Sequence, residues 1–187
     1  MKIDENIAKK YNLTEEEIAL TMSGYAPLVV EANEFFLKEG KICNYIGFVV
    51  KGLLRSYIYD EEANEITSDF FPENTLIISF DSFNNRVPSK ENIKAIENSE
   101  LMVISYESQK ELYRKIPAWN LICRDLADYK SREMIERANR FQIMSATERY
   151  QTFCNEHHDL LQRTTLGNIA SYIGVDIATL SRIRRKR

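Results

Sequence analysis

Between residues 28 and 105, short apolar runs with intervening polar residues are separated by turn residues. Runs of this length and composition predict β-strands. The predicted strands cover residues 28–30, 34–37, 45–51, 53–59, 65–71, 75–80, 93–97 and 101–105. Many short strands at this spacing indicate a β-sandwich or jelly roll.

Segments with sequence patterns typical of helices lie before and after this region. Thr14 and Glu17 form a capping box that opens a short helix. After the strands, residues 108–115 predict a short helix, and Pro117 opens a longer one in which apolar residues recur at helical spacing, namely Trp119, Ile122, Leu126, Tyr129, Met134, Ala138 and Phe141. A stripe this long exceeds what one small sheet covers, so part of it is expected to pack against a second subunit. The alternative is that it lies wholly on its own sandwich.

A further helix over residues 147–156, capped by Thr147 or Ser145, leads to two short amphipathic helices near the C-terminus. Their predicted buried positions are Ile169, Ile173, Val175, Leu180 and Ile183. Gly174 ends the first helix because glycine adopts the left-handed conformation without a clash. Asp176 is a good N-cap for the second helix, and the small Ala170 lets the two helices approach closely. This pattern is typical of a helix-turn-helix.

The C-terminal segment differs from the rest of the chain in net charge. Residues 161–187 carry a net charge of +5, while residues 1–160 carry −8. A negative body repels DNA and confines attraction to the basic end. The alternative is a helical hairpin with a solvated basic end, because runs of charge are usually just solvated faces.

Composition excludes several other classes. The chain has 187 residues, 44% of them hydrophobic, with no apolar stretch long enough for a membrane span and no signal-peptide core at its start, so we expect a cytoplasmic protein that uses no membrane. The three cysteines are widely spaced, and the only histidines are the adjacent pair His157 and His158. Neither arrangement predicts a disulfide framework or a metal site. An enzyme of the jelly-roll type is the weakest hypothesis, since no nucleophile and base converge in the roll residues.

Three strings of residues carry a resemblance to a known family. They are residues 39–55 with their glycine turn, the segment 70–73 (Phe-Phe-Pro-Glu), and residues 146–150 followed by 169–174 and 180–183. In this order they resemble the Crp/Fnr family of bacterial transcription regulators. The resemblance implies an α+β fold with a cyclic-nucleotide-binding-like sensor roll over residues 1–116. A dimerisation helix and hinge would follow over 117–144, and a winged-helix-like helix-turn-helix domain over 145–187.

The sensor part departs from the pattern of the members that bind cyclic AMP. In those members the cassette runs Phe-Gly-Glu and ends in Arg-Ser or Arg-Thr, whereas here Pro72 replaces the glycine and residues 88–91 (Pro-Ser-Lys-Glu) stand at the end. Without a bidentate arginine a phosphate loses its strongest partner, so a cyclic nucleotide is not expected, and no cofactor is assigned. The effector positions implied by the resemblance are Glu73, Asn74, Arg86, Ser89 and Lys90. Iron–sulfur and haem sensing are not expected, because the chain has no N-terminal cysteine cluster and residues 1–156 contain no histidine.

The resemblance also assigns roles in the basic helix. Arg182 matches the family's guanine-reading arginine; Thr179 and Ser181 are expected at bases or phosphates, and Arg184, Arg185, Lys186 and Arg187 at phosphates. The usual Arg-Glu or Pro-Glu pair at the helix start is replaced by Ile177 and Ala178.

The leading hypothesis is therefore a homodimeric regulator that binds double-stranded DNA. Its expected dimer contacts are Trp119, Ile122, Leu126, Tyr129, Met134 and Phe141. RNA polymerase and a small-molecule effector are its further expected partners. The alternative is a ligand-binding or protein-interaction module whose helix-turn-helix no longer binds DNA.

Overall fold

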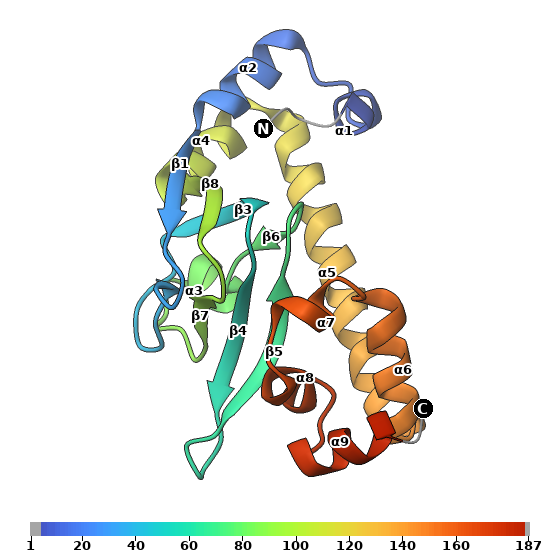
Figure 1. Ribbon diagram of the computed structural model, residues 1–187. Coiled ribbons are helices and arrows are strands. Elements are labelled where there is room, and N and C mark those ends of the chain that lie inside the picture. Colours follow the sequence, from blue (N-terminus) through green and yellow to red (C-terminus); the bar gives the residue numbers. More distant parts are fainter. Residues whose placement is uncertain (1–4, 186–187) are drawn as a thin grey trace.

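A computed structural model describes residues 5–185 of the chain, and within them eight strands form a roll of two four-stranded sheets (Figure 1). The first sheet has the order β1-β8-β3-β6 and the second β2-β7-β4-β5, and the paired strands are antiparallel. The strands are β1 (Tyr25–Val30), β2 (Phe35–Leu37), β3 (Tyr45–Lys51), β4 (Leu54–Tyr59), β5 (Glu65–Phe71), β6 (Leu76–Ile77), β7 (Asn92–Ala95) and β8 (Ser99–Ser105). The predicted roll is thus confirmed.

The roll closes on a core of aliphatic and aromatic side chains supplied by both sheets. Val49, Leu54, Ile77 and Ile93 are fully buried there. Two predicted strands differ clearly in extent. β1 begins at Tyr25, before the predicted start at residue 28, and β6 ends at Ile77, because Phe80 already belongs to α3 (Phe80–Asn85). This short helix places Phe83 in the roll core.

Helices cover one end of the roll. α1 (Glu5–Lys10) was not predicted, whereas α2 (Glu15–Ser23) begins at the predicted capping box, in which the side chains of Thr14 and Glu17 each bond the other's backbone N–H. α4 (Tyr106–Lys115) follows β8 directly, and α5 (Pro117–Ile143) has its proline in the first turn, where the missing N–H costs nothing. No helix within residues 5–185 is long and apolar enough to cross a membrane.

The first turns of α5 belong to the core of their own chain. Trp119 and Ile122 are 7% and 6% exposed and pack with Ile104, Leu112 and Ile116. The expectation that these two residues face a second subunit is therefore wrong, because α4 and the end of β8 already cover them. Beyond Ile122, large apolar side chains of α5 remain exposed.

Four further helices complete the described chain: α6 (Ala146–Glu156), α7 (Leu160–Arg163), α8 (Leu166–Tyr172) and α9 (Ile177–Arg185). Ser145 caps α6 through a capping box with Glu148. Leu160, Ile169 and Leu180 form the centre of their core. No strand occurs in residues 146–185, so the described part lacks the wing expected from a winged-helix-like domain.

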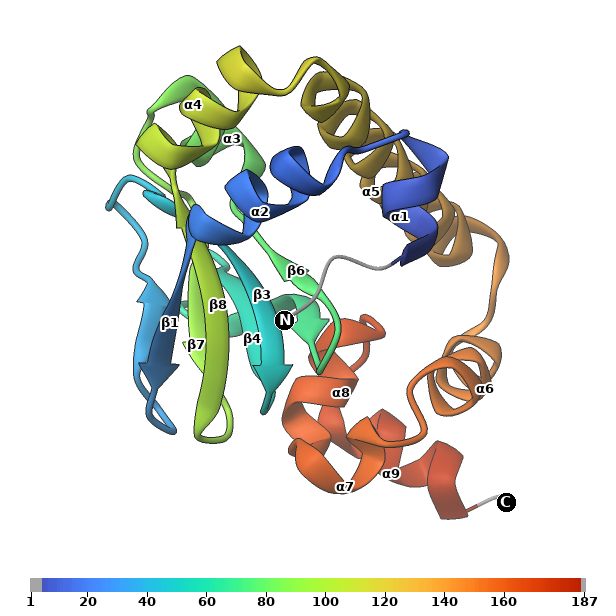
Figure 2. The same cartoon turned by 90° about the horizontal axis from the view of Figure 1, so that it is seen from above.

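The C-terminal helices fold back onto the roll. α5 runs past the sheets, the chain reverses at Met144, and α8 lies against β5 (Figures 1 and 2). Leu53 and Phe70 of the roll share one apolar cluster with Phe153, Leu160 and other residues of the C-terminal helices. The roll and the helix-turn-helix are thus joined by a common core.

Candidate nucleic-acid interface

The turn between α8 and α9 has the predicted geometry. Ile173 is the C-cap of α8, and Gly174 after it has φ +68°, a conformation that glycine adopts freely. The N–H of Val175 donates to the carbonyl of Ala170 at 2.9 Å, which closes the turn. Ala170 is 1% exposed at the helix crossing, as its small side chain predicts.

Asp176 caps α9, as predicted. Its Oδ1 accepts from the Thr179 N–H at 2.7 Å and its Oδ2 from the Thr179 hydroxyl at 2.9 Å. These bonds, the backbone bond first, hold the pKa of the Asp176 carboxyl below its usual value. The hydroxyl oxygen of Thr179 in turn accepts from Nη2 of Arg182 at 2.8 Å. A relay of three side chains therefore aligns the guanidinium with the first turn of α9.

The two faces of α9 differ sharply. Leu180 is fully buried, and Ile183 packs against the same cluster. Helical spacing places Ala178, Ser181, Arg182 and Arg185 on the opposite side. Arg182, Arg184 and Arg185 are exposed, and Thr179 and Ser181 are partly exposed. Lys186 and Arg187 lie outside the described residues.

The back of the helix-turn-helix is held by two arginines that sequence reasoning missed. Arg149 of α6 donates through Nε to the carbonyl of Ile173 at 2.8 Å. Arg137 of α5 donates to the carbonyls of Thr67 and Ser68 on β5 and, at 3.2 Å, to that of Tyr172 on α8. Cations at a helix C-terminus compensate its unpaired carbonyls and its dipole. Arg137 therefore connects the long helix, the roll and the helix-turn-helix at one point.

The five effector positions implied by the resemblance are not brought together around one open site. Glu73 is engaged by Arg163 and by the N–H of Gly52, and Asn74 forms a turn with φ +65°. Lys90 is exposed to solvent.

Arg86 and Ser89 are committed to their own surroundings. The Arg86 guanidinium donates to the carbonyl of Cys43 at 2.7 Å and stacks on the ring of Tyr106 at 4.2 Å. Ser89 is 4% exposed and donates to the carbonyl of Glu91 at 2.9 Å. Burial raises the pKa of the Glu91 carboxyl beside it. An arginine would be needed here to hold a phosphate, and the structure instead has the hydroxyl of Ser89 and the partly buried carboxyl of Glu91.

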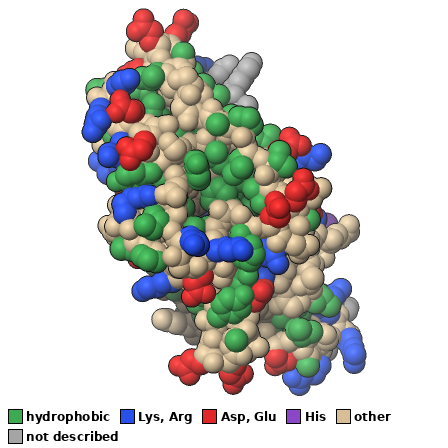
Figure 3. Space-filling view, turned by 90° about the vertical axis from the view of Figure 1, so that its left-hand side faces the viewer, with side chains coloured by type: hydrophobic (Ala, Val, Ile, Leu, Met, Phe, Trp, Pro, Cys, Tyr) green, Lys and Arg blue, Asp and Glu red, His purple; other side chains and the backbone are tan. Residues whose placement is uncertain are grey.

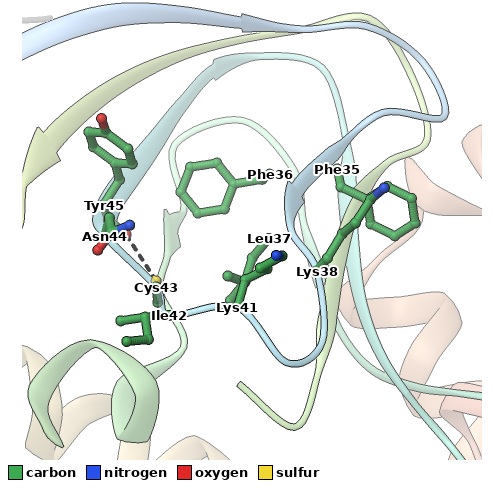
Figure 4. Close-up of a pocket in the computed structure, with 9 residues that line it drawn as sticks. All are labelled: Phe35, Phe36, Leu37, Lys38, Lys41, Ile42, Cys43, Asn44 and Tyr45. Carbon is green, nitrogen blue, oxygen red and sulfur yellow. Dashed lines mark hydrogen bonds between the residues drawn. The ribbon is translucent and has the colours of Figure 1, made fainter. Parts of the chain in front are cut away.

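A separate pocket of about 250 Å³ opens between β2 and the start of β3 (Figure 4). Aromatic and aliphatic side chains line it together with Lys38 and Lys41. The Lys38 and Lys94 ammonium groups lie 4.7 and 5.5 Å from the centre of the Phe35 ring. None of the expected effector residues lines this pocket. The face of the molecule in Figure 3 mixes acidic, basic and hydrophobic side chains without a broad basic surface.

Comparisons with known proteins agree with this geometry. Residues 27–115 match the family model described as the cyclic nucleotide-binding domain. A comparison with curated proteins found no match.

Solved structures share the arrangement over most of the chain. FixK2 from Bradyrhizobium japonicum has a TM-score of 0.77 at 15% identity, with 87% of this chain and 83% of that one covered. A putative Crp/Fnr-family regulator from Eubacterium rectale has a TM-score of 0.75 at 18% identity, covering 94% and 83%. The c-di-GMP-responsive regulator CLP from Xanthomonas campestris has a TM-score of 0.70 at 15% identity, covering 92% and 91%. The predicted resemblance is therefore confirmed at the level of the fold.

Proposed function

We propose that the chain is a homodimeric, DNA-binding transcription regulator of the Crp/Fnr type. The observation that carries the proposal is the exposed face of α9. There Arg182 is aligned by Thr179 and Asp176, while Leu180 anchors the opposite face. Such a helix fits the major groove, where a guanidinium recognises the O6 and N7 atoms of guanine.

Arg182 is the proposed base reader, with Thr179 and Ser181 beside it. Arg184, Arg185 and, beyond the described residues, Lys186 are proposed to contact phosphates. Ile177 is 56% exposed at the start of α9 and is available to a thymine methyl group. Ile177 and Ala178 replace the Arg-Glu or Pro-Glu pair that family members carry at the start of this helix. This replacement therefore changes which bases the helix is expected to recognise, while α9 stays exposed.

Dimerisation is proposed through the part of α5 beyond Ile122. Leu126, Tyr129 and Met134 are 39%, 54% and 69% exposed, and Ile135 is 60% exposed next to Met134. Phe141 is 42% exposed, but its ring already contacts the helix-turn-helix turn at Gly174. The proposed interface is therefore centred on Met134 and Ile135. Pairing there would let two copies of α9 enter successive major grooves about 34 Å apart.

We infer that a cyclic nucleotide is not the effector. Ser89 and Glu91 stand where a phosphate would need an arginine, and Arg86 is committed to the Cys43 carbonyl. Thermal-shift titration with cyclic AMP, cyclic GMP and c-di-GMP should leave the melting temperature unchanged, since only a ligand that binds the native state raises it. RNA polymerase is the proposed partner through which the dimer acts, in the cytoplasm.

The DNA-binding test starts from a site selected out of a random duplex pool. Arg182→Ala should weaken binding to this site by ~1 to 3 kcal/mol and relax its selectivity. Arg114→Ala removes an equal charge from α4, far along the chain, and serves as the control. Affinity of the parent should fall steeply with salt, because phosphate contacts release counterions. Selection that yields no binding site, with flat and undetectable binding, would favour the alternative of a helix-turn-helix that no longer binds DNA.

The dimer test uses Met134→Glu, which places a charge in the proposed seam. Sedimentation should show a monomer, whereas Val29→Glu, at an apolar side chain that is 61% exposed on β1, should leave the dimer intact. A dimer that survives Met134→Glu with unchanged affinity contradicts this interface.

A further inference from the structure

Arg163, the last residue of α7, carries the densest set of charged contacts in the described part of the chain. Its Nη1 and Nη2 donate to the two carboxylate oxygens of Glu73 at 2.8 and 2.9 Å. Its Nε and Nη2 donate to the two oxygens of Glu97 at 3.0 and 2.9 Å. Both carboxylates belong to the roll, Glu73 after β5 and Glu97 between β7 and β8. One guanidinium of the C-terminal helices is therefore held in bidentate fashion by two separate loops of the roll.

This ion-pair cluster lies at the rim of the shared apolar core. The side chains of Arg163, Glu73 and Glu97 are 23%, 35% and 36% exposed, so water screens them only in part. Glu73 is fixed by a third donor, the N–H of Gly52 at 2.9 Å. Bidentate pairs fix geometry as well as adding energy, so the cluster sets an angle between the two parts.

A second set of contacts fixes α8 on β5. The Thr67 N–H donates to the hydroxyl of Ser171 at 2.6 Å, and that hydroxyl donates to the Glu65 carbonyl at 3.1 Å. Arg55 of β4 donates to Oδ1 of Asn168 at 2.6 Å. All of these contacts use α7 and α8. The outward face of α9 remains free, with Arg182 exposed.

We propose that Arg163 is a positioning residue for DNA binding, which locks the helix-turn-helix to the roll through Glu73 and Glu97 in the orientation that presents α9. This rests on the proposed function. A dimer must present two recognition helices at once, and an apparent dissociation constant is the intrinsic one divided by the competent fraction. A helix-turn-helix domain that moves about the hinge at Met144 is oriented for DNA binding only part of the time. The ion pairs of Arg163 raise the fraction of molecules in that orientation before DNA binds.

Two variants that each remove one charge distinguish an orienting role of Arg163 from a purely electrostatic attraction of this residue to DNA. Arg163→Gln removes a positive charge and Glu73→Gln removes a negative one, yet both break the bidentate pair. If Arg163 acted only as a cation near DNA, the two variants would change affinity in opposite directions. The lock predicts that both weaken binding, each by roughly tenfold or more, through the loss of competent fraction. The double variant should be little worse than Arg163→Gln alone, since Glu73→Gln breaks only the Arg163–Glu73 pair, which Arg163→Gln already removes together with the pair to Glu97.

The experiment measures affinity of the full chain for the selected site over a range of salt concentrations. The salt dependence should keep the parent's slope in both variants, whereas loss of a phosphate contact lowers it by about 1. Hydrogen exchange at the Thr67 amide should become faster in both, because its acceptor Ser171 moves away with α8. Arg114→Gln is the matched control: it removes an arginine whose partner, Glu111, lies 2.7 Å away on α4. It should change neither readout.

Unchanged or tighter DNA binding by Arg163→Gln overturns the proposal, and tighter binding by Glu73→Gln does so as well. Glu73→Gln keeps an oxygen for the Gly52 N–H, so it serves if Arg163→Gln fails to fold; circular dichroism and sedimentation check both. A parent that binds no DNA refutes the proposed function itself. A parent that binds, is weakened by Arg182→Ala and is unaffected by the lock variants refutes only the lock.

Discussion

Three glycines with positive φ are expected to respond to alanine in a graded series. Gly40 has φ +78° and leaves open space to 4 Å around an added Cβ. At Gly174, with φ +68°, the added Cβ would lie 2.5 Å from Cε1 of Phe141. At Gly52, with φ +104°, it would lie 2.7 Å from the Cα of Ser99. The same substitution therefore meets empty space, a side chain and a backbone in turn.

The magnitudes follow from these neighbours. Gly40→Ala should cost only the left-handed conformation, about 1 kcal/mol of unfolding free energy. Gly174→Ala adds the displacement of the Phe141 ring from its rotamer, which costs about 1 kcal/mol more because that side chain is partly exposed and can turn. Gly52→Ala forces backbone against backbone, and we expect a loss above about 4 kcal/mol, in the range of severe core changes.

Urea unfolding followed by circular dichroism measures the series. One transition is expected, because Leu53 and Phe70 of the roll share a core with the C-terminal helices. Phe141→Ala combined with Gly174→Ala should return the glycine penalty to about that of Gly40→Ala. Equal losses at Gly40 and Gly52, or no relief from Phe141→Ala, would refute the geometric reasoning.

Further predictions concern titration, capping and thiol reactivity. Arg163 lowers the pKa of Glu73 to about 2, so this pair should stabilise the fold above the unfolded carboxyl's pKa of about 4.3 and lose its effect as the pH falls towards 2; acid unfolding of Glu73→Gln should show a shallower pH dependence there. Ser145→Ala removes the cap of α6 and should cost about 1 kcal/mol in urea unfolding, and a smaller loss in Ser145→Asp would confirm the capping role. Burial raises the pKa of the Cys43 and Cys123 thiols, so alkylation at pH 8 should be slow in the native chain and fast in urea; fast native labelling of Cys43 would contradict its burial.

Local pattern was sufficient to predict the roll and the helix-turn-helix. Short apolar runs separated by turn residues identified the strands, and the positions of Gly174 and Asp176 identified the turn and the cap, because these features depend on neighbours in sequence. α3 and α7 were missed because four to six residues give no helical period to read. The strand predicted over residues 75–80 extended too far because the short helix α3, which begins at Phe80, gave no helical period that would have ended the strand earlier.

Contacts between distant residues could not be predicted in this way. The apolar spacing of α5 identifies a stripe but not what covers it, and the structure assigns Trp119 and Ile122 to the chain's own core. Arg137 contacts β5 residues that lie 69 and 70 positions away in the chain. Such an arginine has no signature in a single sequence, since any exposed helix carries similar charges.

The position of Arg163 also changes the electrostatic argument for DNA binding. The sequence assigns +5 to residues 161–187, and Arg163 contributes one of those charges. In the folded chain two carboxylates of the roll surround it, so it adds little to the field outside the protein. Among the described residues of that segment, the remaining positive charges are the exposed arginines of α9: Arg182, Arg184 and Arg185. In the proposed complex with DNA, the attractive positive charge of the described residues is therefore concentrated on α9 and is smaller than the net charge of residues 161–187 implies. The acidic side chains Glu73 and Glu97 of the roll hold α7, through Arg163.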